Sequence, residues 1–260
     1  MQSSDGATTT WAEQNILALE QARPLHSCPP GSDVELAQAY GLQRTLVDAL
    51  VARGSWGAPR GYKSALTAER VHQAMGLSEP VIGVLFEAGE RTAEQPILID
   101  RPVFLETEIG FRLDEAIDQP VSAQEVKRLV REYVGVVELA SPHLVEQVTG
   151  AGLVATNSAS YAYITGQSWP ASGSLDINAC SVSLKREGQA LHDAPASGVM
   201  GDQWTALAWL VNTTLHQGYT IEADQLLITG SIGAVHAATP GAYQASFGDL
   251  GALAFTLFSH

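Results

Sequence analysis

The sequence predicts an α+β fold, a mixed β-roll that follows an N-terminal helical region. Short apolar runs of strand length dominate the chain after its first quarter, helical periodicity is confined to a few segments, and strands and helices do not alternate regularly as they do in doubly wound α/β proteins. We therefore expect an N-terminal helical region at residues 1–58 and a β-roll domain, which would carry the chemistry, at residues 59–260.

The N-terminal region is predicted to hold two helices. A weaker helical pattern covers residues 11–21, and the proline-containing segment 24–31 separates it from a long amphipathic stretch. Ser32 and Asp33 are the predicted N-cap of this second helix, and Gly54 is its predicted end.

The later elements follow from local patterns. Thr67 could cap a short helix, and Val81–Phe86 is typical of a buried strand. Ser122 and Glu125 form a capping-box signature ahead of a helix of about ten residues. Further strands are predicted at residues 97–99, 103–113, 133–139, 161–165, 179–184, 226–229 and 253–258, with a hairpin turn at 185–188 and a late helix that Asp202 caps and Gly218 ends.

Composition and charge narrow the possible partners. Acidic residues outnumber basic ones by 28 to 14, so the formal net charge is −14. Nucleic acids and anionic membranes are bound by clustered cations, and no apolar run approaches the ~18 residues of a spanning helix, so we expect neither partner. Two cysteines, Cys28 and Cys180, suit a reducing compartment, and residues 1–10 show no signal-peptide pattern. We therefore expect a cytoplasmic protein.

Three carboxylates stand in otherwise apolar strands. Glu106 and Glu108 are separated by one residue, so the period of two places both on one strand face. Glu138 lies near the end of the apolar run 133–139. Carboxylates in such places are costly unless a cation lies between them, and three of them suit a hard ion such as Mg²⁺ or Mn²⁺. The simpler alternative is that Glu106 and Glu108 form the solvent-facing row of an antiparallel strand.

Lys63 is the second candidate, because the segment around it carries few other charges. Its ammonium could hold a carboxylate or enolate oxygen beside a metal, or donate a proton, but alone it could equally be a surface lysine. The histidines show no zinc-ligand spacing, and the nucleophile motif Gly-x-Ser-x-Gly is absent from the sequence. We expect residues 230–233 to form a tight turn near the site rather than a phosphate-binding loop.

An ordered set of short motifs resembles one known family. The motifs are Gly61-x-Lys63-x-x-Leu-Thr67, Gly83-x-Leu-Phe86, Glu106-x-Glu108-Ile, Glu138, Val154-Ala-x-Asn157 and Leu227-Ile-Thr-Gly230-x-x-Gly233. Their order and spacing resemble the 2-keto-4-pentenoate hydratase and 4-oxalocrotonate decarboxylase family, within the fumarylacetoacetase superfamily. The resemblance extends over nearly the whole chain.

The resemblance implies a mixed β-roll of the fumarylacetoacetase C-terminal type, a homo-oligomer, and a Mg²⁺ or Mn²⁺ ion bound by Glu106, Glu108 and Glu138. It also implies a small-molecule substrate, either a 2-oxo acid or a 2-hydroxydienoate from the degradation of aromatic compounds. Lys63 matches the active-site lysine of the family.

Three further positions are candidates for substrate binding through the same resemblance: Asn157, Ser160 and Gly230. Two family acids are altered nearby. Pro-Asp-Phe-Gly is replaced by a segment with Val81 in the place of the acid, and Asp-Asn-Ala-Ser by one with Thr156 in the place of the acid.

Three classes of function stay open on the sequence. The first is a metal-dependent lyase, a hydratase or a decarboxylase, acting on a 2-oxo acid or 2-hydroxydienoate. The second is different C–C bond chemistry on the same scaffold, because the altered acids permit other proton routes. The third is a non-catalytic relative that binds a metal ion and an oxo acid.

Overall fold

The first part of the chain is helical, and strands predominate in the rest, with further helices between them. The computed structural model describes residues 2–31, 34–171 and 175–260. The helices are α1 (Gln2–Glu20), α2 (Leu36–Arg53), α3 (Glu69–Ala74), α4 (Ala123–Leu129), α5 (Gly150–Ala155) and α6 (Gln203–His216). The strands are β1 (Pro59–Ala65), β2 (Val81–Phe86), β3 (Glu90–Arg91), β4 (Ile97–Leu98), β5 (Phe104–Leu113), β6 (Val130–Ala140), β7 (Ala162–Pro170), β8 (Ser181–Arg186), β9 (Gln189–Pro195), β10 (Leu226–Ile228), β11 (His236–Ala237), β12 (Gly241–Phe247) and β13 (Ala252–Phe258). The predicted α+β class is confirmed.

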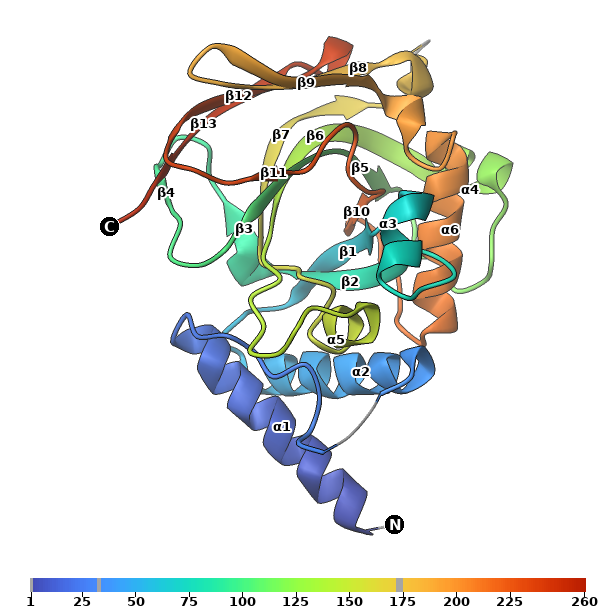
Figure 1. The fold of residues 1–260 in the computed structure, drawn as a ribbon. Coiled ribbons are helices and arrows are strands. Elements are labelled where there is room, and N and C mark those ends of the chain that lie inside the picture. The colour runs from blue at the N-terminus through green and yellow to red at the C-terminus, as the bar shows by residue number, and fades with distance from the viewer. Residues whose placement is uncertain (1, 32–33, 172–174) are drawn as a thin grey trace.

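Two sheets form the framework. The larger has the strand order β2-β1-β10-β5-β6-β7-β3, with β11 paired to β5, and the smaller has the order β4-β13-β12-β8-β9. In the larger sheet β1 pairs with β10 and β3 with β7 in parallel, while the other neighbours are antiparallel, so the sheet is mixed as predicted. Figure 1 shows this sheet curling around its own interior, with the smaller sheet on one side and α1 and α2 on the opposite side.

The second helix begins later than predicted. The N-cap of α2 is Glu35, whose side chain and that of Gln38 form a reciprocal capping box, whereas Ser32 and Asp33 lie outside the described residues. Gly54 ends the helix in the left-handed conformation, as predicted.

Two other capping predictions have different outcomes. The residue at the N-cap position of α3 is Ala68, so Thr67 is not the cap. The capping box of Ser122 and Glu125 is confirmed, but α4 is only seven residues long because Val130 is extended and begins β6. The prediction for the late helix is confirmed, with Asp202 at its N-cap.

Strands β1, β3, β9, β11 and β12 were not predicted, because their sequences contain few large apolar residues. The clearest cases are β9 and β12. Their pairing with β8 and β13 makes them strands, which is a tertiary effect that local patterns do not show. The hairpin turn between β8 and β9 was predicted, and Glu187 and Gly188 there both have positive φ angles.

An apolar cluster fills part of the interior of the larger sheet. This inner cluster consists of Leu85, Val134, Val136, Tyr163, Leu226 and Ile228. A Cβ atom added at Gly110 would lie only 2.7 Å from Leu226 and 2.8 Å from Val134, so Gly110 faces this cluster. Because side chains alternate along β5, Glu108 lies on the same inward face. The strands therefore place acidic groups directly beside a dry apolar region.

The main hydrophobic core joins the N-terminal helices to both sheets. It includes Trp11 of α1, Leu46 of α2, Ile109 of β5 and Phe255 of β13, each at most 3 % exposed. The predicted boundary between the helical region and the β-roll domain falls between α2 and β1, and their division into two units stays a prediction. Among the described residues, no helix has the length and apolar character required to cross a membrane.

Candidate functional site

The three predicted carboxylates converge inside the larger sheet. Strands β5 and β6 are antiparallel neighbours, and their register places Glu106 directly opposite Glu138. One oxygen from each of Glu106, Glu108 and Glu138 lies within 4.8 Å of the others. Glu108 and Glu138 are fully buried and Glu106 is half-buried. The alternative of a solvent-facing row therefore does not fit the structure.

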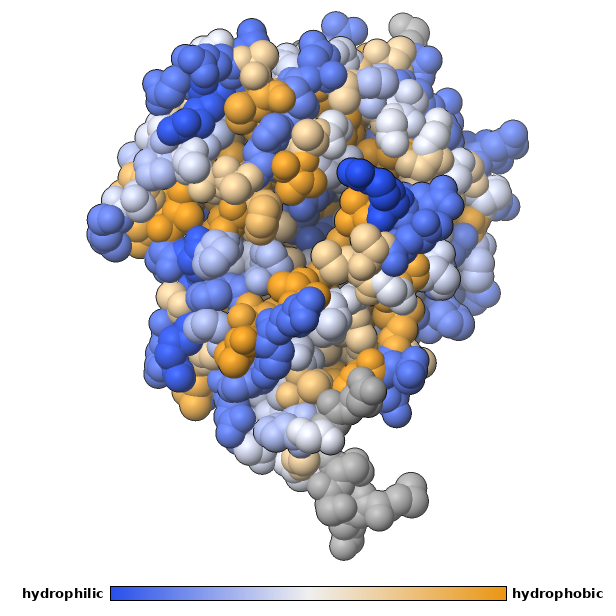
Figure 2. All heavy atoms as spheres, viewed as in Figure 1, coloured by the Kyte–Doolittle hydropathy of each residue, from blue (hydrophilic) through white to orange (hydrophobic). Residues whose placement is uncertain are grey.

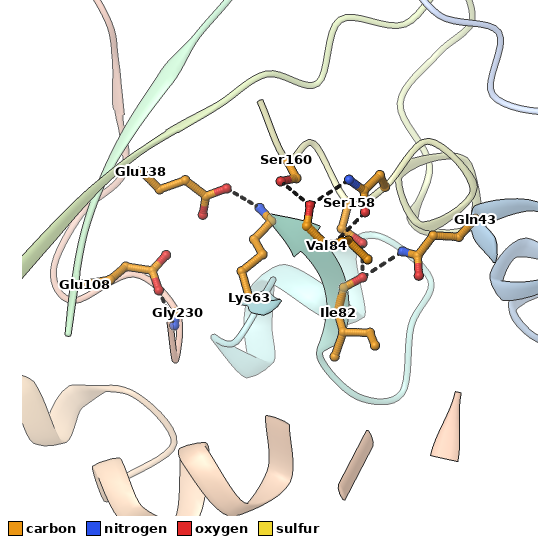
Figure 3. Close-up of polar contacts among 10 residues, drawn as sticks. Gln43, Lys63, Ile82, Val84, Glu108, Glu138, Ser158, Ser160 and Gly230 are labelled. Carbon is orange, nitrogen blue, oxygen red and sulfur yellow. Dashed lines mark hydrogen bonds and ion pairs between the residues drawn. The ribbon is translucent and has the colours of Figure 1, made fainter. Parts of the chain in front are cut away.

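Lys63 enters the same group from β1. Its Nζ atom lies 2.7 Å from Oε1 of Glu138, and its side chain is buried. Figure 3 shows Lys63, Glu138 and Glu108 pointing toward one another. Figure 2, in the same view as Figure 1, shows a hollow in the molecular surface between α3 and β11, in front of the interior of the larger sheet. One ammonium therefore faces three carboxyl groups in a confined space.

Burial and mutual repulsion make these carboxyl groups hard to ionise. Burial, followed by repulsion from Glu138, raises the pKa of Glu106 to about 7, against the opposing effect of Lys63. Burial and the two neighbouring carboxylates raise the pKa of Glu108 well above its ordinary value. Burial alone would lower the pKa of Lys63, but attraction by Glu138, Glu106 and Glu108 outweighs it, so the pKa is raised and the lysine stays charged.

Several of the carboxylate oxygens lack hydrogen-bond donors. The backbone N–H of Gly230 donates to Oε2 of Glu108 at 2.6 Å, whereas Oε1 of Glu108 has no hydrogen-bond partner within the described chain. Both oxygens of Glu138 also lack a well-oriented hydrogen bond there, although Oε1 is ion-paired with Lys63. Buried acceptors of this kind are costly, and a hard divalent cation would satisfy them. This set of carboxylate oxygens therefore fits the ligand preference of Mg²⁺ or Mn²⁺.

The turn that contains Gly230 was predicted to be tight and close to the site. Gly230 has a φ of +112°, and a Cβ atom there would lie 2.5 Å from Thr67, so only glycine fits without strain. Thr67 therefore packs against this turn and does not cap α3. The turn aims a backbone donor at Glu108, and a role of Gly230 in substrate binding stays a prediction.

Asn157 and Ser160 lie at the edge of the site, but their polar groups contact the backbone of β2. Asn157 accepts from the N–H of Val84 at 2.7 Å and donates to its carbonyl oxygen at 2.9 Å. The Ser160 hydroxyl donates to the same oxygen, as Figure 3 shows. The hydroxyl of Ser158 donates to the carbonyl of Ile82 at 2.6 Å. These contacts pair the free edge of β2, and substrate binding by Asn157 and Ser160 stays a prediction.

The segment that makes these contacts is itself unusual. Asn157, Ser158 and Ala159 have φ angles of +68°, +52° and +58°, so three successive non-glycine residues are left-handed. This conformation costs roughly 1–2 kcal/mol per residue, and the side-chain bonds to β2 offset part of it. A Cβ atom at Gly83 would lie 2.9 Å from the carbonyl oxygen of Asn157 and 3.2 Å from Cε of Lys63, so the segment packs against the lysine end of the site.

The two positions where the family acids are altered, Val81 and Thr156, contact apolar groups or the nearby backbone. Val81 is fully buried in the main core, and the alternation along β2 places it on the same face as Gly83, which faces Lys63. The hydroxyl of Thr156 donates to the carbonyl of Gly152 one turn earlier. Neither residue supplies a carboxylate to the site.

Sequence reasoning missed Gln43, which links α2 to the site. Its side chain is fully buried and donates to the carbonyls of Ile82 and Val154, while it accepts from the hydroxyl of Tyr219. The available signal was a polar residue on the apolar stripe of an amphipathic helix, three positions after Tyr40. Such a residue requires buried partners, and these partners are revealed only by the tertiary structure.

Comparison with known proteins supports the resemblance seen in the motifs. No family model matches the chain. A 2-keto-4-pentenoate hydratase from Paraburkholderia xenovorans is 27% identical over 215 residues, which cover 80% of this chain and 78% of that protein. The likeness to the 2-keto-4-pentenoate hydratases is confirmed.

Solved structures give the same result for the fold. A 4-oxalocrotonate decarboxylase from Pseudomonas putida, complexed with calcium and acetate, superposes with a TM-score of 0.88 at 20% identity and covers 98% of both chains. The same enzyme is also known with magnesium and adipate. A fumarylpyruvate hydrolase from Pseudomonas aeruginosa, in complex with Mn²⁺ and pyruvate, has a TM-score of 0.59 at 13% identity over 77% of this chain and 90% of its own. The predicted fold is confirmed, and these relatives of the chain are enzymes, as the motifs led us to expect.

Lowering the pH is expected to stabilise the metal-free protein. Glu106 has a pKa of about 7 in the folded chain, above its ordinary value of 4.5, so between these values the folded state binds more protons than the unfolded state. The free energy of unfolding should therefore fall as the pH rises through that window. We expect the Tm of chelator-treated protein to decrease from about pH 5 to about pH 8.

The control for this prediction is Glu106→Gln, which cannot ionise at this position and should show a smaller decrease, with Glu108 as the remaining group of raised pKa. Excess Mg²⁺ should also reverse the trend in the unmodified protein, because the ion requires ionised carboxylates. A Tm that does not fall over this range in the metal-free protein, or falls equally in Glu106→Gln, would contradict the assignment.

Proposed function

We propose that the protein is a metal-dependent lyase, a hydratase or decarboxylase, that acts on a 2-oxo acid or 2-hydroxydienoate from the degradation of aromatic compounds. The observation that carries the proposal is the group of three inward carboxylates with unsatisfied oxygens beside buried Lys63. The relatives named as hydratase and decarboxylase support the reaction class, and the metal complexes of the solved relatives support Mg²⁺ or Mn²⁺.

Each group of residues in the site would have its own role in this reaction. Glu106, Glu108 and Glu138 would hold the ion, which when bound supplies Lewis-acid stabilisation of developing negative charge on a chelating 2-oxo acid. Lys63 keeps its proton because the surrounding carboxylates raise its pKa, so Nζ acts as a donor to a substrate oxygen and not as a general base. The inner apolar cluster excludes water from one side of the group.

A second candidate is different C–C bond chemistry on the same scaffold, and within the first proposal the same observation favours decarboxylation over hydration. Val81 favours it, because an apolar side chain stands where the family resemblance implies an acid, on the strand face that carries Gly83 opposite Lys63. Without that acid, activation of water is weakened, whereas withdrawal of charge by the ion is retained.

We further propose that the protein is a homo-oligomer and lies in the cytoplasm. Light scattering would test the oligomeric state, and cell fractionation would test the location.

Glu108→Gln is expected to weaken the binding of Mg²⁺ or Mn²⁺ at least tenfold, or about 1.4 kcal/mol, because a neutral amide replaces a charged ligand. The metal-dependent rise in Tm should shrink accordingly. Titration calorimetry measures the affinity, and Glu115→Gln, which removes an exposed acid, controls for net charge. Unchanged affinity in Glu108→Gln would refute the metal site.

Lys63→Met is expected to abolish turnover while metal binding is retained, because the ammonium is a proton donor and not a ligand. General acid catalysis typically contributes about 10²–10⁴-fold, so the loss in kcat should lie at least in this range. The assay uses 2-hydroxypenta-2,4-dienoate with Mg²⁺. Turnover at the level of the unmodified protein would show that Lys63 has another role.

Val81→Asp is expected to raise the rate of hydration of the same dienoate. It adds a carboxylate on the face of β2 that carries Gly83, and Gly83 lies opposite Lys63 of β1. The unmodified protein should hydrate this substrate poorly but bind oxalate in the presence of Mg²⁺. Product analysis separates hydration from decarboxylation. Efficient hydration by the unmodified protein would rule out the argument from the altered acids.

A further inference from the structure

Behind the carboxylate group, on the opposite face of β5, a chain of hydrogen bonds connects the two sheets. Thr107 lies between Glu106 and Glu108 and is fully buried, so its side chain points away from them. Its hydroxyl donates to the carbonyl of Ile232 at 2.9 Å, and the N–H of Ile232 donates to the carbonyl of Thr107 at 2.7 Å. One residue of β5 thus fixes the turn that follows Gly230 at two points.

The geometry assigns the direction of each bond in this chain. Because the single hydroxyl proton of Thr107 goes to Ile232, Nε2 of His192, at 2.9 Å, must donate to the hydroxyl oxygen. Nδ1 of neutral His192 is then an acceptor for Nε2 of His236, at 3.1 Å. Burial and the neighbouring His236 lower the pKa of His192, which keeps the ring neutral.

The turn is shaped to receive this histidine. A Cβ atom at Gly233 would lie 2.6 Å from the ring of His192, so the glycine lets the ring approach the backbone. At the other end of the turn, the hydroxyl of Thr229 donates to the buried side chain of Gln203 at 2.7 Å. The backbone between these two anchors includes Gly230, whose N–H donates to Glu108.

We propose that His192 is a positioning residue for the metal site. It acts through Thr107, which holds β5 and the Gly230 turn in the register that leaves one oxygen of Glu108 occupied by a backbone donor and the other free for the ion. The inference rests on the proposed function, because it assumes that the carboxylates bind a divalent ion. It makes the smaller sheet, through β9, a support for ligands on the larger one.

The test is the affinity for Mn²⁺ measured by titration calorimetry on the full chain. His192→Phe keeps a ring against Gly233 but cannot donate a hydrogen bond, and Thr107→Val keeps the shape of the side chain but lacks the hydroxyl. Each variant should therefore raise the Kd for Mn²⁺ roughly tenfold, which is the lower end of the effect expected when a residue that orients a metal ligand is changed. His192→Gln can place an amide N–H near the position of Nε2 and should restore most of the affinity. His26→Phe, at an exposed ion pair with Glu146, is the matched control and should bind as the unmodified protein does.

The double variant His192→Phe/Thr107→Val should lose no more affinity than either single variant, because both remove one interaction. Unchanged affinity in His192→Phe and Thr107→Val, or failure of His192→Gln to recover affinity, overturns the proposal. If His192→Phe does not fold, Thr107→Val with His192→Gln decides in the same way. Failure of the proposed function is distinguishable, because then the unmodified protein would not bind Mn²⁺ or Glu108→Gln would bind it normally.

Discussion

The repulsion among three inward carboxylates, with one buried ammonium to oppose it, is the constraint on which the rest of the site depends. Glu106 and Glu138 face each other across β5 and β6, an arrangement that destabilises an antiparallel pair when both are charged. Lys63 relieves part of the repulsion and Gly230 satisfies one oxygen of Glu108. The remaining cost is relieved when a carboxyl group is protonated, and the proposed divalent cation would relieve it as well.

The surrounding structure holds these groups together at several points. The Gly230 turn is anchored by Thr229 at one end and by Thr107 at the other. The edge of β2, which pairs with the Lys63 strand, is completed by side chains from the left-handed segment and by Gln43 from α2. Each anchor comes from a different part of the chain. Helices and the second sheet thereby contribute to a site whose charged residues all lie on β1, β5 and β6.

The same arrangement explains how altered residues and a familiar site coexist. The three carboxylates stand on β5 and β6, two long central strands, and their register is strongly fixed because a slip of one residue would turn every side chain to the other face. The positions that differ from the family pattern, Val81 and Thr156, lie on an edge strand and just after a short helix. Neither position takes part in the β5–β6 register that brings the carboxylates together.

The sequence alone determined the α+β class, several helix ends, more than half of the strands, and the candidacy of Glu106, Glu108, Glu138 and Lys63, because charges in apolar strands and capping residues are local signals. Only the tertiary structure decided that Glu106 faces Glu138, that Thr67 packs on a turn, and that Gln43 and His192 have buried polar partners. It also made β9 and β12 strands. The physical reason is that these features depend on pairing between residues distant in sequence, where the partner, and not the residue itself, determines the free energy.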